Sequence, residues 1–76
     1  SMNDKLPVAS VVTLFNKKEK YIILGKNILN DCIVYDYMGG VYPFGFNKKE
    51  DFIYFNDDDI EFLCFLGDIN YRVGEK

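Results

Sequence analysis

The sequence has no histidine, tryptophan or glutamine, and few hydroxyl side chains other than those of tyrosine. Without histidine, the commonest general base of enzyme active sites is missing. Ser10 and Thr13 have no base at an obvious partner position, so a serine-type triad has no support. Cys64 stands between Leu63 and Phe65, which would not activate its thiol. We therefore expect a protein that is not an enzyme.

Basic residues are also scarce, because 9 Lys and Arg stand against 12 Asp and Glu, a formal net charge of -3. Nucleic-acid binding depends largely on neutralising phosphates, so this balance argues against a nucleic-acid partner. The lysines at 17–20 and 48–49 each lie beside an acid and predict solvated turns. No apolar run approaches the roughly 20 residues of a membrane helix, and nothing after Met2 resembles a signal peptide. We expect a cytoplasmic protein with no membrane partner.

Only two cysteines are present, Cys32 and Cys64, each inside an apolar run. This predicts reduced core side chains, and a disulfide stays possible if their strands are neighbours. Two cysteines without histidine cannot complete a tetrahedral zinc site in one chain. The glycines at 39, 40 and 45 are not followed by the Gly-Lys-Ser/Thr of a phosphate loop. We expect no metal and no cofactor.

The acidic run at 56–61 has consecutive carboxylates and no glycine at the turn, unlike a calcium-binding EF-hand loop. It predicts a capped surface turn instead. Asp58 and Glu61 have the spacing of a capping box, with Asp in place of Ser or Thr.

Apolar residues are plentiful: 49% of the chain is hydrophobic and 17% aromatic, too apolar for a disordered protein. A chain of 76 residues makes one domain with one core. We place this domain at 6–69 and expect the termini, 1–5 and 70–76, to fray, with Ser1 interpreted as a protease-cleavage scar. A chain of this size buries only about 60% of its unfolded surface, so we expect modest stability unless a partner adds to it.

Runs of β-branched and aromatic residues predict five strands, at 6–15, 21–24, 32–38, 52–55 and 61–66. Polar residues 16–20 predict a hairpin turn, and Asn27, Asn30 and Asp31 a loop. Gly39-Gly40 predicts a break or bulge, and the segment 42–45 a turn. Residues 60–66 could instead form a helix, because a short apolar run does not fix the period.

This layout predicts a mainly β fold. The two forms it allows are a small five-stranded SH3-like barrel and a strongly bent antiparallel sheet. Either form carries one short helical turn near residues 56–59.

The segment 35–45 resembles the central signature of a domain-of-unknown-function family of small Gram-positive bacterial proteins. The residues that carry the motif are Tyr35, Asp36, Tyr37, Gly39, Tyr42, Pro43 and Gly45. Residues 6–14, 22–25 and 55–67 resemble the flanking parts, so the resemblance spans about residues 6 to 67. Members are often encoded beside type VII secretion LXG toxin genes. The resemblance implies a chaperone-like accessory protein that binds the toxin's targeting region before export.

Three apolar residues, Phe44, Phe62 and Leu66, stand where the family pattern is often polar. Strand alternation would place Phe62, Cys64 and Leu66 on one face and Leu63 with Phe65 on the other. Both faces are then apolar, which suggests that one lines the core and the other meets a partner. Tyrosine has a polar tip on an apolar body, which suits interfaces. The expected partner contacts are Tyr42, Phe44, Phe62 and Leu66.

The first hypothesis is thus a protein-binding accessory factor for toxin export. The alternatives are an immunity or inhibitor protein that blocks a toxin domain, where negative charge would suit a basic toxin, and a small-ligand-binding barrel. Two exposed apolar strand faces would also permit a homodimer.

Overall fold

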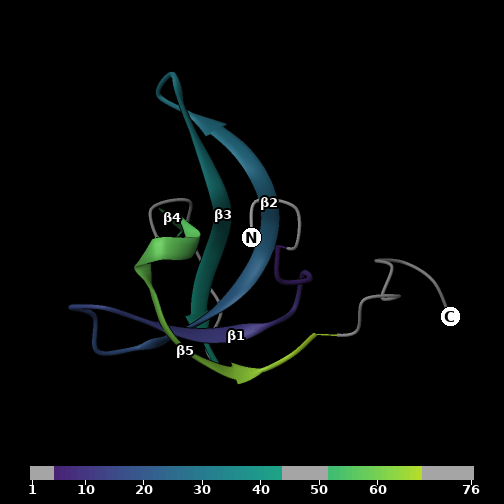
Figure 1. Cartoon of the computed structure of the whole chain (residues 1–76), viewed down its shortest axis with the longest axis vertical. Coiled ribbons are helices and arrows are strands. Elements are labelled where there is room, and N and C mark those ends of the chain that lie inside the picture. The colour runs from purple at the N-terminus through teal and green to yellow at the C-terminus, as the bar shows by residue number, and fades with distance from the viewer. Residues whose placement is uncertain (1–4, 44–51, 68–76) are drawn as a thin grey trace, which may run out of the picture.

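The computed structural model describes residues 5–43 and 52–67. In this part of the chain the elements are β1 (Val11–Leu14), β2 (Lys20–Asn30), β3 (Ile33–Tyr42), β4 (Ile53–Phe55), the 3₁₀ turn η2 (Asp57–Asp59) and β5 (Ile60–Phe65). They form one antiparallel sheet in the order β4-β3-β2-β1-β5, which bends strongly (Figure 1). Because β4 and β5 lie at opposite edges, the sheet is open. The mainly β fold is confirmed in its bent-sheet form, and the barrel form is not adopted.

β2 and β3 make a long hairpin that projects beyond the other strands (Figure 1). Its turn is Asp31-Cys32, with φ of 54° and 66°, the left-handed conformations that a two-residue hairpin turn requires. The loop expected over 27–31 is therefore wrong except at Asp31, and β2 does not end near Gly25. β2 continues to pair with β3 beyond Lys26↔Tyr37, as far as the turn. Cross-strand pairing outweighs the turn preference of the asparagines in β2.

Gly39 and Gly40 do not break β3, contrary to expectation. A Cβ at Gly39 would lie 2.8 Å from the carbonyl oxygen of Ile22 and 3.1 Å from Cε1 of Phe55. Gly39 therefore permits a close approach of β2 and β4 to β3. The register shift of this hairpin falls instead between Ile23 and Gly25 in β2.

The core lies on one face of the sheet and contains Val12, Leu14, Tyr21, Ile23, Tyr37 and Phe55. Tyr37 is completely buried, and its ring centroid lies 5.3 Å from that of Phe55. Leu6, near the start of the described chain, and Ile60, the first residue of β5, pack against this cluster. Ser10 is also buried, and its Oγ accepts a hydrogen bond of 2.9 Å from the Gly67 N–H, which ties the end of β5 to the segment before β1.

β5 is a strand, so the helix alternative for 60–66 is wrong. It pairs with β1 through two register shifts, one between Val11 and Val12 and the other between Thr13 and Leu14. At these shifts β5 contains one more residue than β1, Cys64 and Glu61 respectively, as in a β-bulge.

The bulges change which side chains of β5 share a face. Phe62 lies opposite Thr13, and Phe65 lies opposite Val11, two positions along β1. Directly opposite residues of an antiparallel pair share a face, as do residues i and i+2 of a regular strand. Phe62 and Phe65 therefore lie on the same face, and the simple alternation that separated them is wrong.

Candidate protein-binding surface

The face of the sheet away from the core carries exposed aromatic rings. The register places Tyr42, Lys20, Thr13 and Phe62 in one row across β3, β2, β1 and β5. A second row contains Gly40, Ile22, Val11 and Phe65. Gly40 and Val11 are buried, so Phe65 is the exposed large side chain of this row. We call these two rows the outer face. Since adjacent strands are about 4.8 Å apart, the backbones at Tyr42 and Phe62 are roughly 14 Å apart when measured along the sheet.

The aromatic side chains of the outer face are open to solvent. Phe62 is 63% exposed, Phe65 62% and Tyr42 43%, and Leu66 just after β5 is 58% exposed. Leu63 is 48% exposed although it lies opposite the core residue Val12. The apolar surface expected on the last strand is therefore present at Phe62 and Leu66, and Phe65 and Leu63 extend it. That these residues bind a partner stays a prediction.

Of the other expected contacts, Tyr42 ends β3 and joins the outer face through the register. Phe44 and the motif residue Gly45 lie outside the described residues. Pro43 follows Tyr42 through a cis peptide bond and is exposed.

Sequence reasoning missed a second apolar surface at the end of the β2–β3 hairpin. We call this surface the hairpin tip. It consists of Leu29, Val34 and Ile33, which are 68%, 67% and 52% exposed. Leu29 and Val34 lie directly opposite each other. The signal was available, because apolar pairs at 28–29 and 33–34 flank a short polar segment, the pattern of a tight hairpin. The hairpin was not predicted, because a loop was expected at 27–31.

Acidic side chains occupy the turn that precedes β5. Asn56 is its N-cap residue, and Asp59 Oδ2 accepts a hydrogen bond of 2.9 Å from the Asn56 N–H. The capped turn is thus confirmed, but the capping residues are Asn56 and Asp59 rather than Asp58 and Glu61. Asp58, Asp59 and Glu61 are exposed. We call Asp57–Asp59 the acidic turn.

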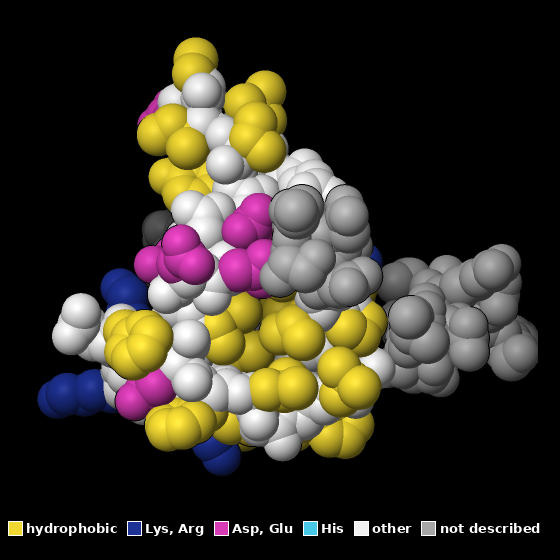
Figure 2. Space-filling view, viewed as in Figure 1, with side chains coloured by type: hydrophobic (Ala, Val, Ile, Leu, Met, Phe, Trp, Pro, Cys, Tyr) yellow, Lys and Arg dark blue, Asp and Glu magenta, His cyan; other side chains and the backbone are white. Residues whose placement is uncertain are grey.

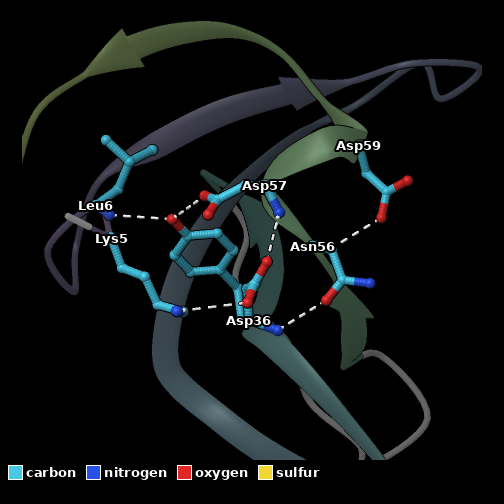
Figure 3. A network of polar contacts seen from close by, with 7 residues as sticks. Lys5, Leu6, Asp36, Asn56, Asp57 and Asp59 are labelled. Carbon is cyan, nitrogen blue, oxygen red and sulfur yellow. Dashed lines mark hydrogen bonds and ion pairs between the residues drawn. The ribbon is translucent and has the colours of Figure 1, made fainter. Parts of the chain in front are cut away.

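A polar network holds the acidic turn against β3 (Figure 3). The hydroxyl of Tyr37 donates to Asp57 Oδ1 and accepts a hydrogen bond of 3.0 Å from the Leu6 N–H. Asp36 Oδ2 accepts a bond of 2.9 Å from the Asp57 N–H, and the Asp36 N–H donates to Asn56 Oδ1 at 2.8 Å. The network thereby fixes both the acidic turn and the start of β5.

The Lys5 ammonium lies 3.4 Å from Asp36 Oδ1 and joins the same network (Figure 3). The motif residues therefore differ in role. Asp36 and Tyr37 organise the acidic turn, and Tyr35 stacks at a tilt on Tyr54 with ring centroids 5.6 Å apart. Much of the motif thus serves the fold.

Burial and the hydrogen bond donated to Asp57 raise the pKa of Tyr37 to about 12, against the smaller opposing effect of the Leu6 N–H. Burial, with Glu19 nearby, also raises the pKa of Tyr21. A phenol whose pKa is higher in the folded state keeps its proton to a higher pH there. The contribution of Tyr37 to stability is therefore fully present below pH 10 and is lost as the pH rises from 10 towards 12.

We therefore expect the free energy of unfolding to fall over this alkaline range. Tyr37→Phe should lose part of that pH dependence and Tyr21→Phe another part. The measurement is urea unfolding at pH 9 to 12 of the two variants and the unsubstituted protein. Parallel curves for Tyr37→Phe and the unsubstituted protein would contradict the assignment.

The cysteines are not core residues, contrary to expectation. Cys32 lies in the hairpin turn and Cys64 at a bulge of β5, and both are free and exposed. Within residues 5–43 and 52–67 there is no group of three metal-ligating side chains and no pocket. No helix in this part of the chain is long and apolar enough to cross a membrane.

A family model described as "Domain of unknown function (DUF4176)" matches residues 5–70, most of the chain. The match includes the outer face, the hairpin tip and the polar network. No curated protein and no solved structure matches the chain significantly.

Proposed function

We propose that this chain, which belongs to the domain-of-unknown-function family DUF4176, is a non-catalytic accessory protein that acts by binding another protein. The observation that carries the proposal is the outer face, where Phe62, Phe65 and Tyr42 are exposed on one face of the sheet. Aromatic side chains contribute much of the binding energy of protein interfaces, because they bury a large area while losing little rotamer freedom.

The exposed side chains are numerous for so small a domain. Phe62, Leu63, Phe65 and Leu66 are four large apolar residues within five consecutive positions, each about half exposed or more. Contiguous apolar surface of this kind marks interaction sites, since water contact with it is unfavourable. A partner that covered them would gain hydrophobic free energy without any change in the core cluster, whose residues are already buried.

The partner that we propose is the LXG toxin of a type VII secretion system, bound stoichiometrically in the cytoplasm before export. The support for this identity is the resemblance of the segment 35–45 to the signature of proteins encoded beside such toxins. The support for the binding mode is the outer face. Neither element of the proposal requires a cofactor or a catalytic group.

The test is co-expression with the LXG protein encoded nearest its gene, followed by purification through a tag on one partner. We expect a complex stable at micromolar concentration for the unsubstituted chain. Phe62→Ser with Phe65→Ser should weaken it by more than roughly ten-fold, because two exposed aromatic anchors are lost. Lys18→Ser, in the exposed turn between β1 and β2, is the control and should bind normally.

Because Phe62 and Phe65 are more than half exposed, the double variant should fold, and its thermal unfolding curve verifies this. No complex with the unsubstituted chain, or equal binding by the double variant, would refute the proposal. A dimer of this chain alone whose formation depends on Phe62 and Phe65 would assign the outer face to self-association instead.

The exposed carboxylates of Asp58, Asp59 and Glu61 favour one alternative, an immunity protein that covers a basic toxin domain. Truncating the toxin distinguishes the two functions. An export accessory would bind the targeting region and leave toxicity unchanged, whereas an immunity protein would bind the toxic domain and abolish toxicity. The ligand-binding alternative assumed a closed barrel, which the open sheet does not provide.

A further inference from the structure

Three exposed zones follow one another along the molecule. The hairpin tip lies at one end, and β5 lies towards the other (Figure 1). Both carry exposed apolar side chains. The acidic turn lies between them, and Figure 2 shows acidic side chains between an apolar upper end and an apolar lower area. The zones thus alternate in character, apolar, acidic and apolar.

The positions of these residues along the strands give the same order of the three zones. Val34 of the tip lies two residues before Asp36 in β3, and Asp36 is hydrogen-bonded to Asp57 of the acidic turn. Asp59, the last residue of that turn, lies three residues before Phe62 of β5. At about 3.3 Å per strand residue, these steps and the turn between them add up to a path of roughly 25 Å between the two apolar zones, which is the upper limit of their separation. The molecule itself measures 35 Å along its longest axis.

The sheet edges are poorly suited to a partner strand. β5, at one edge, has bulges at Glu61 and Cys64 in its pairing with β1, and bulges bend and twist an edge strand away from the regular ladder that strand addition needs. β4, at the other edge, has only three residues. A partner would therefore contact side chains rather than extend the sheet, and an amphipathic helix is the usual element for such contacts. A helix of about 20 residues is 30 Å long and spans all three zones.

We propose that the segment recognised by this chain is one amphipathic α-helix with apolar residues towards both ends and basic residues at its centre. Its ends lie on the hairpin tip and on the apolar residues of β5, and its centre lies on the acidic turn. The inference rests on the proposed function, because it specifies the chemistry of the protein partner. The described residues of this chain form no helix longer than η2, so they do not offer such a helix to a second copy.

The test uses synthetic helical peptides of about 20 residues, labelled for fluorescence anisotropy. The first has an apolar stripe and three central arginines, the second has glutamates in place of the arginines, and the third has the apolar stripe replaced by serine. We expect the arginine peptide to bind best, the glutamate peptide roughly ten-fold more weakly, and the serine peptide not at all. Added salt should reduce the difference between the first two.

Substitutions on the protein give the matching half of the experiment. Asp58 is exposed, and its side chain makes no hydrogen bond or ion pair with a described residue, so Asp58→Lys should fold. Asp58→Lys should weaken binding of the arginine peptide by roughly five-fold and strengthen binding of the glutamate peptide. The double variant Leu29→Ser with Val34→Ser should weaken binding of both peptides on the order of ten-fold, because the apolar side chains of the hairpin tip are removed. Lys18→Ser should leave both affinities unchanged.

Equal affinity for the arginine and glutamate peptides, or binding to neither, would overturn the helix proposal, as would unchanged binding by the tip variant. These outcomes are distinct from failure of the proposed function. If the LXG complex is lost with Phe62→Ser and Phe65→Ser but kept with Leu29→Ser and Val34→Ser, the chain binds a protein without using the tip. If the peptides bind as expected but no LXG complex forms, the helix chemistry holds and the named partner is wrong.

Discussion

Replacing Tyr37 by phenylalanine is expected to lower the free energy of unfolding by about 2 kcal/mol, although only one oxygen atom is removed. The Tyr37 side chain is completely buried, and its hydroxyl both donates to the Asp57 carboxylate and accepts from the Leu6 N–H, in hydrogen bonds that are partly buried. Its loss leaves a carboxylate and a backbone donor without these partners. For a domain of this size the melting temperature should fall by on the order of 10 °C, measured by circular dichroism.

Tyr42→Phe is the matched control for this experiment. Tyr42 is 43% exposed, so loss of its hydroxyl should change stability by less than about 0.5 kcal/mol. If Tyr37→Phe were as stable as the unsubstituted protein, the network would not be what fixes the acidic turn. Any loss of partner binding by Tyr37→Phe should result from its lower stability, since Tyr37 is not part of the outer face.

The second large effect is expected at Gly39, where alanine should destabilise the protein by about 2 kcal/mol. Its Cβ would lie 2.8 Å from the Ile22 carbonyl oxygen, a backbone atom that cannot move without shifting β2. It would also lie 3.1 Å from the Phe55 ring in the core. The strand pairing on both sides of β3 would therefore loosen. Urea unfolding with a linear extrapolation measures the loss.

Gly25→Ala on the same hairpin is the comparison variant. Its Cβ would be closest to Ile28 Cδ1, at 3.2 Å, which is the end of a flexible side chain. We expect a change within about 1 kcal/mol, because that side chain can adjust and alanine loses less backbone entropy than glycine on folding. Equal effects at Gly39 and Gly25 would show that the close approach of β2 to β3 is not a constraint.

The same network connects stability with the proposed binding surface. Asp36 and Tyr37 hold the acidic turn, and that turn leads directly into β5 with its exposed phenylalanines. The central motif therefore acts on the surface indirectly, by placing the strand that carries it. Tyr42, the motif residue that ends β3, is itself part of the outer face.

Local chemistry in the sequence was sufficient to predict the mainly β class, the strands around the core and the capped acidic turn. β-branched and aromatic runs favour extended backbone, and an asparagine before three aspartates favours a capped turn, whatever the rest of the chain does. Exposure of Phe62 and Leu66 was also predictable, because one small domain has little interior to cover both faces of its last strand.

Only the tertiary structure decided which residues share a surface. The length of β2 depends on its pairing with β3, so the hairpin tip appears only when the two strands are aligned. The bulges at Glu61 and Cys64 arise from the fit of β5 to β1, and they place Phe65 beside Phe62 on the outer face. Such contacts between distant residues depend on packing across the whole sheet, which no local pattern encodes.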